Sequence, residues 1–128
     1  MSEHPGEMGD RTVGLPPSGV ISWTDFERVD LRVGVVVRAE PFPEARTPAY
    51  KLWIDLGPLG QRRSSAQITH RYDPAALVGR PVICVVNFPP KRIGPFVSEV
   101  LVLGAYVEGR EVVLLRPDED VAPGSRIG

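Results

Sequence analysis

The chain has little of the chemistry on which most enzymes and metalloproteins depend. Its 128 residues include one cysteine, Cys84, and two histidines, His4 and His70. A single cysteine excludes an intramolecular disulfide, and one cysteine with a distant histidine does not supply the ligands of a zinc site. The sequence also lacks the glycine-rich loop, ending in a lysine–serine or lysine–threonine pair, that binds nucleotide phosphates. We therefore predict a protein that is not an enzyme and that holds no metal and no cofactor.

Long hydrophobic runs are absent as well. No apolar stretch approaches the roughly 20 residues that a membrane-spanning helix needs. The first ten residues are acidic and polar, without the basic segment and apolar stretch of a signal peptide. Together with the low cysteine content, these absences predict a cytoplasmic protein that does not insert into membranes.

The charges are unevenly distributed along the chain, although the net charge is only −1. Residues 1–27 contain five acidic residues and one basic residue, whereas residues 60–99 contain six basic residues and two acidic ones. A local basic region of this kind fits a phosphate-binding surface, and it also fits an ordinary solvated surface. The charge pattern leaves both interpretations open.

The ordered part of the chain is predicted to begin near residue 21. Residues 1–20 are rich in glycine, proline and charge, which predicts a disordered tail, and residues 21–128 form one predicted domain. Thr24 and Glu27 have the spacing of a capping box, in which each side chain satisfies a free backbone amide of the other residue. Trp23 and Phe26 give this short helix an apolar face, which we expect to seal one end of the domain.

The rest of the chain has the pattern of strands. Apolar and polar residues alternate over residues 29–37, and Gly34 within this run predicts a bulge or a sharp bend. Asp73, Pro74 and Gly79 predict one helical turn between the third and fourth strands. This order favours an all-β fold, a five-stranded Greek-key OB-fold barrel with a short terminal helix. Further strands are predicted over residues 50–56, 62–69, 81–88, 98–107 and 111–115.

One loop combines several features of a binding site. The segment 87–99 holds two basic residues, two phenylalanines and three prolines. Prolines restrict the backbone and so reduce the entropy that is lost on binding. Lys91 and Arg92 are suited to phosphate, and Phe88 and Phe96 to stacked bases or an apolar groove. We expect these rings to project outward; the alternative is that both point into the core.

Two other segments are candidate parts of the same surface. Residues 42–48 form a second proline-rich loop with one phenylalanine and one arginine. Residues 62–67 have polar side chains at alternate positions. These side chains fit an open barrel face and fit a solvated surface strand equally well. Cys84 lies between apolar residues in the most apolar strand, so we expect it to be buried and unreactive.

Several motifs occur in an order that resembles the tRNA-binding-domain family. The double-proline loop and the strand over residues 64–69 are similar to the CsaA proteins within that family, and the match covers residues 23–128. The motifs are Asp30-Leu31-Arg32-Val33-Gly34, Tyr50-Lys51-Leu52, Ser65-Ala66-Gln67-Ile68-Thr69, Val86-Asn87-Phe88-Pro89-Pro90-Lys91-Arg92 and Ser98-Glu99-Val100-Leu101-Val102-Leu103-Gly104.

The resemblance implies a five-stranded OB-fold that works as a homodimer, without enzymatic activity or cofactor. CsaA proteins are chaperones with affinity for exported preproteins, which they bind in apolar pockets. Their relatives bind the outer corner of tRNA through the loop that corresponds to residues 87–98. Tyr50 and the sequence Glu99-Val100-Leu101 depart from the pattern of the tRNA-binding relatives, and these departures favour peptide binding.

We accordingly predict a homodimeric chaperone for protein secretion that binds preproteins or unfolded peptides, with tRNA as a second ligand. The alternatives are a structure-specific tRNA-binding protein and, third, a scaffold that only pairs with another protein. The predicted peptide-binding residues are Phe42, Tyr50, Trp53, Phe88 and Phe96. The predicted RNA-binding residues are Arg62, Arg63, Asn87, Lys91, Arg92 and Ser98. The predicted dimer interface contains Trp23, Phe26 and Ile127.

Overall fold

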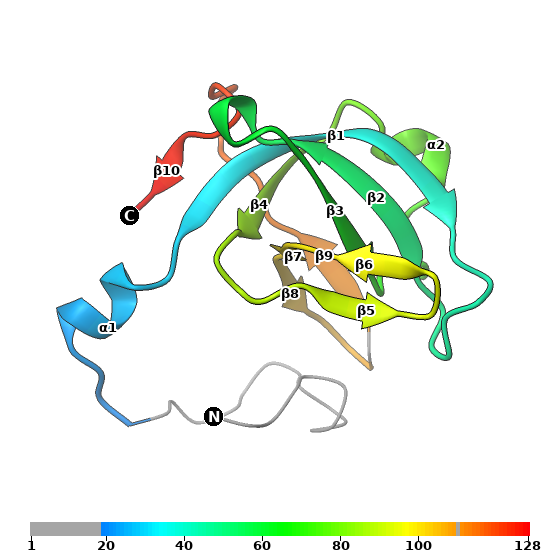
Figure 1. Ribbon diagram of the computed structural model, residues 1–128, viewed down its shortest axis with the longest axis horizontal. Coiled ribbons are helices and arrows are strands. Elements are labelled where there is room, and N and C mark those ends of the chain that lie inside the picture. Colours follow the sequence, from blue (N-terminus) through cyan, green and yellow to red (C-terminus); the bar gives the residue numbers. More distant parts are fainter. Residues whose placement is uncertain (1–18, 110) are drawn as a thin grey trace.

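The computed structural model describes residues 19–109 and 111–128, in which strands are the main regular structure (Figure 1). The tail predicted over residues 1–20 lies outside the described residues up to residue 18. The elements in chain order are α1 (Trp23–Glu27), β1 (Leu31–Pro41), β2 (Tyr50–Asp55), a 3-10 turn (Gly57–Leu59), β3 (Gln61–Ala66), α2 (Pro74–Leu77), β4 (Pro81–Val85), β5 (Lys91–Ile93), β6 (Phe96–Ser98), β7 (Leu101–Val102), β8 (Gly104–Tyr106), β9 (Val112–Leu114) and β10 (Arg126–Ile127).

The main sheet curls into a nearly closed barrel. Its strands run in the order β3-β2-β1-β4-β7, and neighbouring strands are antiparallel. The two ends of this order meet where the backbone N–H groups of Glu99 and Val100 donate to the carbonyl of Arg63, at 2.7 and 3.2 Å. The structure thus confirms the predicted all-β OB-fold barrel, in which closure removes the unpaired sheet edges.

The long strand β1 makes this closure possible because it pairs with β2 along one part and with β4 along the other. The predicted bulge at Gly34 is wrong: the register shift lies between Val36 and Arg38. Gly34 instead allows a close approach, since a Cβ at this position would lie 2.5 Å from Ile54 Cγ2 and 3.0 Å from Leu56 Cδ2.

The barrel interior is filled by aliphatic side chains from the strands and from α2. The turn of α2 lies between β3 and β4 as predicted, with Asp73 in the extended N-cap conformation and Pro74 as the first helical residue. The Asp73 side chain makes no capping hydrogen bond. Leu77 of α2 is fully buried against the core. The fully buried core residues are Val36, Leu52, Ile54, Leu56, Leu77, Val82 and Cys84.

The helix α1 differs from the prediction in two ways. Its capping box is formed by Ser22 and Asp25, not by Thr24 and Glu27: Ser22 Oγ accepts from the Asp25 N–H at 3.1 Å, and Asp25 Oδ2 accepts from the Ser22 N–H at 3.2 Å. The extended residue before the helix is Ser22, so the box begins there. The expectation that α1 seals the barrel is also wrong, because none of its residues is buried and it projects from the barrel (Figure 1).

The short strand β10 brings the C-terminus to the base of α1. It pairs with β1 through Leu31 and Arg32. Arg32 donates to the Gly124 carbonyl at 3.0 Å and, through Nε, to Asp30 Oδ1 at 2.6 Å. This hydrogen bond from Arg32 lowers the pKa of the Asp30 carboxyl. Because β10 has two residues, its strand pattern was too short to be predicted from the sequence.

Candidate binding surfaces

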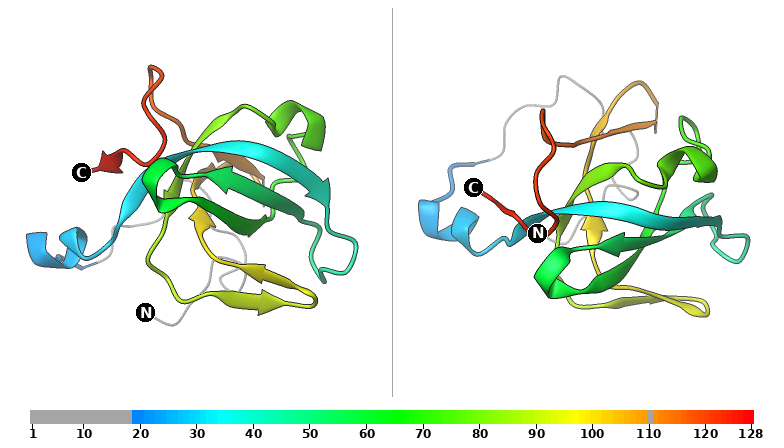
Figure 2. Two further views of the ribbon diagram at one scale, coloured as in Figure 1. Left: turned by 45° about the horizontal axis from the view of Figure 1, so that its top comes forward. Right: turned by 90° about the horizontal axis from the view of Figure 1, so that it is seen from above.

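Residues 91–98, within the segment 87–99 that was predicted as a loop, form a β-hairpin, which lies alongside β3 (Figures 1 and 2). Strands β5 and β6 pair with Ile93 opposite Phe96. Side chains opposite each other in an antiparallel pair share one face. Ile93 and Phe96 therefore face the barrel together, where they pack against Phe42 and Trp53.

Three aromatic rings join the hairpin to the barrel. The Phe42 and Phe96 centroids are 5.5 Å apart, and those of Trp53 and Phe96 are 5.7 Å apart, both in edge-to-face geometry. Phe42 is 3% exposed and Phe96 5% exposed. We call Phe42, Trp53 and Phe96 the ring cluster. It forms a second small core on the outside of the barrel.

The ring cluster contains three of the five residues predicted to bind peptide, Phe42, Trp53 and Phe96. The expectation that Phe96 projects outward is wrong, because the hairpin register turns its ring toward the barrel. Phe42, which was predicted to bind peptide, is buried against Phe96. Tyr50 and Trp53 are half-buried, and the Tyr50 hydroxyl donates to the Tyr72 carbonyl at 2.7 Å. Of the five predicted residues, only Phe88 is exposed, and the structure does not gather them into one groove.

Phe88 lies on the connection from β4 to β5 and is 53% exposed. The residue before it, Asn87, holds this connection in place: Asn87 Oδ1 accepts from the Asp30 N–H at 3.0 Å, and Asn87 Nδ2 donates to the Arg28 carbonyl at 2.7 Å. Pro89, which follows, restricts the backbone on the other side. Asn87 was predicted to bind RNA, but its side chain bonds within the chain.

Some of the predicted RNA-binding residues bond to other residues of the chain, and others are exposed to solvent. Ser98 Oγ accepts from the Ser65 N–H at 3.0 Å, and Arg63 Nε donates to Glu99 Oε1 at 3.3 Å. Lys91 and Arg92 are exposed on β5 and have no acidic partner among residues 19–109 and 111–128. Arg62 is half-buried.

A second set of cations on the outer face of the sheet was not predicted. Arg38 Nε donates to Glu40 Oε2 at 2.6 Å, and Lys51 Nζ lies 3.9 Å from Glu40 Oε1. The Arg38 guanidinium lies 4.3 Å from the centroid of the Trp53 ring. Residues two apart on a strand share a face, so the spacing of Arg38 and Glu40 was a usable signal.

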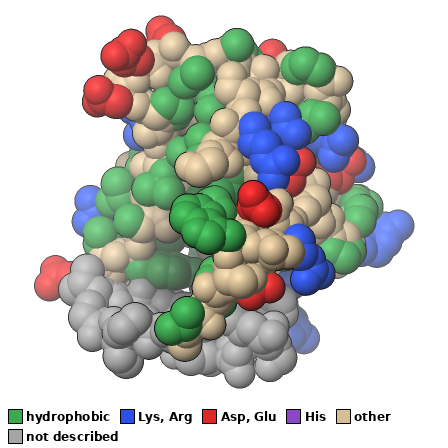
Figure 3. All heavy atoms as spheres, turned by 90° about the vertical axis from the view of Figure 1, so that its left-hand side faces the viewer, with side chains coloured by type: hydrophobic (Ala, Val, Ile, Leu, Met, Phe, Trp, Pro, Cys, Tyr) green, Lys and Arg blue, Asp and Glu red, His purple; other side chains and the backbone are tan. Residues whose placement is uncertain are grey.

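A third surface is apolar and lies at the end of the molecule that carries α1. Trp23 is 80% exposed, and Val20 and Ile21 are exposed beside it. Figure 3 views the molecule from this side and shows hydrophobic side chains across the middle of the face. We call this the end surface, and it comprises Val20, Ile21, Trp23, Phe26, Val29 and Ile127.

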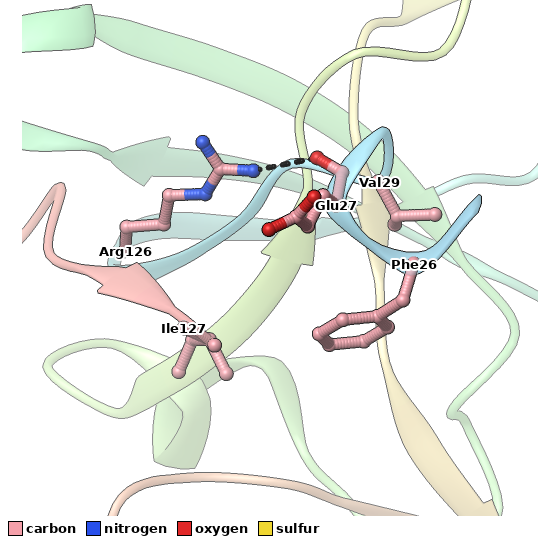
Figure 4. Close-up of a pocket in the computed structure, with 6 residues that line it drawn as sticks. Phe26, Glu27, Val29, Arg126 and Ile127 are labelled. Carbon is pink, nitrogen blue, oxygen red and sulfur yellow. Dashed lines mark hydrogen bonds between the residues drawn. The ribbon is translucent and has the colours of Figure 1, made fainter. Parts of the chain in front are cut away.

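An open groove of about 400 Å³ runs through the end surface, between α1 and β10. Phe26, Val29 and Ile127 line it with apolar groups, and Figure 4 shows them around one opening. Arg126 Nη2 donates to the Glu27 carbonyl at 2.9 Å, which joins the two sides of the groove. The three residues predicted for a dimer interface, Trp23, Phe26 and Ile127, therefore lie on one surface.

Cys84 is fully buried in the core, and burial raises the pKa of its thiol to about 12. A thiol with so high a pKa is protonated at neutral pH and is a poor nucleophile. In the described part of the chain, no three histidine, cysteine or acidic side chains gather in a way that could hold a metal ion. Within the same residues, no helix is long and apolar enough to cross a membrane.

Comparison with known proteins agrees with this architecture. Residues 31–126 match the family model described as "Putative tRNA binding domain". The chaperone CsaA of Bacillus anthracis str. Ames is 51% identical, with a TM-score of 0.82, and the match covers 86% of this chain and 100% of that structure. The CsaA chaperone protein of Picrophilus torridus is 47% identical, with a TM-score of 0.80, over 85% of this chain and 100% of that structure.

A curated relative is much longer. The methionine–tRNA ligase of Rhodopirellula baltica is 41% identical over 112 residues, which are 88% of this chain and 16% of the relative. The chain thus spans about a sixth of that enzyme's length. The family model and the two full-length structural matches together decide the assignment. This chain belongs to the tRNA-binding-domain family and, within it, to the CsaA proteins.

Proposed function

We propose that residues 21–128 form a non-catalytic chaperone domain that works as a homodimer and binds unfolded segments of exported preproteins. Two similar structures are named as chaperones. The observation that carries the proposal is the presentation of Phe88: a large apolar ring, half exposed, on a connection that Asn87 and two prolines hold in place.

The geometry of this connection suits an apolar contact with an extended peptide. Because the backbone around Phe88 is already held, little conformational entropy is lost when a ligand covers the ring. Burying a whole phenylalanine side chain contributes roughly 1.5–3 kcal/mol. About half of Phe88 is still exposed, so its burial contributes about 1 kcal/mol, or roughly a fivefold change in affinity.

The test is Phe88→Ala in the full chain, with binding of a labelled, permanently unfolded preprotein measured by fluorescence anisotropy. The expected result is a roughly fivefold loss of affinity. The matched control is Val78→Ala, because Val78 is also 53% exposed but follows α2 rather than β4. Equal affinities for the wild type and Phe88→Ala would refute this role of Phe88.

The second copy of the chain is the occupant that we propose for the end surface. In the single chain, no residue of α1 is buried, and the groove beside this helix is apolar. A two-fold contact would therefore place α1 of each copy against the other copy. The partner would cover the exposed Trp23 ring and the groove at Phe26 and Ile127. The helix α1, the groove and β10 are adjacent, which supports one continuous surface that could pair with its own copy.

Replacing Trp23 and Phe26 together by serine should convert the dimer to a monomer, because both rings lie on the proposed contact. Light scattering of the full-length variant measures the mass. Since no α1 residue is buried in the single chain, the barrel should keep its thermal stability apart from the loss of the partner. A dimer mass that is unchanged in this variant would contradict the proposal.

Transfer RNA is the second ligand that we propose, and the observation that favours it is the pair of cations on β5 that form no ion pair within residues 19–109 and 111–128. Lys91 and Arg92 are exposed, so their charged groups are accessible to phosphate. Their replacement by glutamine should weaken tRNA retention and make the salt dependence of binding shallower by about 0.7 to 0.9 for each contact that is lost. Absence of any tRNA retention by the wild type at low salt would rule out this ligand.

A further inference from the structure

Three cations on the outer face of the sheet lie over aromatic rings. Arg38 lies 4.3 Å from the centroid of Trp53, and Arg63 lies 5.6 Å from that of Phe96. Lys51 Nζ lies 5.5 Å from the centroid of Phe42. Cations on a strand face are the groups that a nucleic acid backbone would contact, whereas the buried rings of Phe42 and Phe96 are not accessible to bases.

Two glutamates hold these three cations. Glu40 accepts from Arg38 at 2.6 Å and lies 3.9 Å from Lys51 Nζ. Glu99 Oε1 accepts from Arg63 Nε at 3.3 Å and also from the Arg63 backbone N–H at 3.0 Å. The strand register explains the first arrangement, since Glu40 is directly opposite Lys51 in the pairing of β1 with β2.

The two carboxylates oppose phosphate in two ways. A phosphate must compete with a carboxylate that is already bound to the cation, and it must approach a fixed negative charge within a few ångströms. Both effects act at short range, where salt screens them least. Each cation also lies over a ring of the ring cluster, so a movement away from its glutamate that displaced it from the ring would lose a cation–π contact as well.

We propose that Glu40 and Glu99 are specificity-determining residues that withhold Arg38, Lys51 and Arg63 from RNA phosphate. This inference rests on the proposed function, because it explains how a member of a tRNA-binding-domain family keeps one sheet face from RNA while Phe88 is available to peptide. The two glutamates reject RNA by their charge, which is a form of discrimination against a competing ligand.

The experiment compares tRNA binding by the full chain with Glu40→Gln, Glu99→Gln and the double variant, by filter binding between about 0.05 and about 0.3 M salt. Glutamine keeps the oxygen that accepts from the Arg63 N–H and removes only the charge. The double variant frees three cations, so it should bind tRNA about 100-fold more tightly at about 0.1 M salt, with a salt slope steeper by roughly 2 to 3.

The matched control is Glu44→Gln. Glu44 is exposed in the loop after β1, near the hairpin turn at Gly94, and forms no ion pair within the residues that the structure describes. Glu44→Gln changes the net charge by the same amount as Glu40→Gln but frees no cation. It should therefore alter tRNA affinity by less than about twofold. An effect of Glu44→Gln as large as that of Glu40→Gln would overturn the proposal, because net charge would then explain both.

An unchanged tRNA affinity and salt slope in the double variant would also overturn the proposal. If Glu99→Gln fails to fold, Glu40→Gln decides alone, because within the described residues the Glu40 carboxylate contacts side chains and no backbone N–H group. Adding Arg38→Gln to Glu40→Gln should remove the part of the increase in tRNA affinity that Arg38 supplies. Peptide affinity is measured on the same samples. Lack of peptide binding by the wild type would refute the proposed function, whereas the tRNA comparison would still decide the role of the glutamates.

Discussion

Two groups of aromatic side chains serve opposite purposes. Phe42, Trp53 and Phe96 pack edge to face and join the hairpin to the barrel. Trp23 and Phe88 are exposed, at the end surface and on the β4–β5 connection. The difference does not come from residue type or from the local composition, since Phe88 and Phe96 belong to the same proline-rich segment. For these two phenylalanines it comes from whether the backbone that carries the ring is paired in a strand.

Pairing determines the direction of each ring in this segment. Phe96 is a strand residue opposite Ile93, so its side chain must share a face with Ile93. Phe88 precedes the hairpin and has no strand partner. Its position is set by Asn87, which bonds to the backbone between α1 and β1. One phenylalanine therefore contributes to folding, and the other is available for binding.

The strongest test of this comparison is the pair Phe96→Ala and Phe88→Ala, with the free energy of unfolding measured in denaturant. Removing a buried phenylalanine costs about 3–5 kcal/mol, because it loses buried apolar area and leaves a cavity. Removing the half-exposed Phe88 should cost less than about 1 kcal/mol. Similar losses for both variants would mean that Phe88 is part of a core, and the division of the two groups would not hold.

Much of the barrel was predictable from the sequence, because its strands alternate and its turns carry strong signals. The alternation over residues 29–37 and the Asp73-Pro74 helix start both led to elements that the structure contains. The hairpin was missed since β5 and β6 have three residues each, too few to show a period, and prolines flank them. Burial of Phe96 follows from that pairing and could not be predicted without it.

The candidate site was less predictable than the fold. Asn87 and Ser98 were predicted to contact RNA because their side chains can hydrogen-bond, but that same capacity is used within the chain, by partners that lie 57 and 33 residues away in the sequence. Long-range partners of this kind do not show in local patterns. The expectation that α1 seals the barrel was wrong for a related reason: an amphipathic helix indicates which side it would bury, but not whether its own barrel or a second copy covers it.

A smaller effect is expected from the side chain that positions Phe88. Asn87→Ala removes two hydrogen bonds, which should lower the free energy of unfolding by about 1 kcal/mol and loosen the β4–β5 connection. Peptide affinity should then fall although Phe88 is unchanged, because the ring is no longer held. Asn87→Asp is the matched variant: it keeps the acceptor for the Asp30 N–H and loses the donor to the Arg28 carbonyl. If the Asp30 amide exchanged hydrogen faster in a variant that kept full peptide affinity, binding would not need the fixed connection.

The smallest effect is expected at α1, where Ser22→Ala removes the hydrogen bond to the Asp25 N–H. Loss of an N-cap costs a helix about 1 kcal/mol, so the Asp25 amide should exchange roughly fivefold faster. The single barrel should keep its unfolding free energy, because no α1 residue is buried in it. The dimer is different: if α1 lies in the partner's groove, fraying of the helix should weaken association, and the mass measured by light scattering should depend more steeply on protein concentration. A fall in barrel stability at concentrations where the protein is monomeric would instead show that α1 packs on its own barrel, and the contrast between the ring cluster and the end surface would be lost.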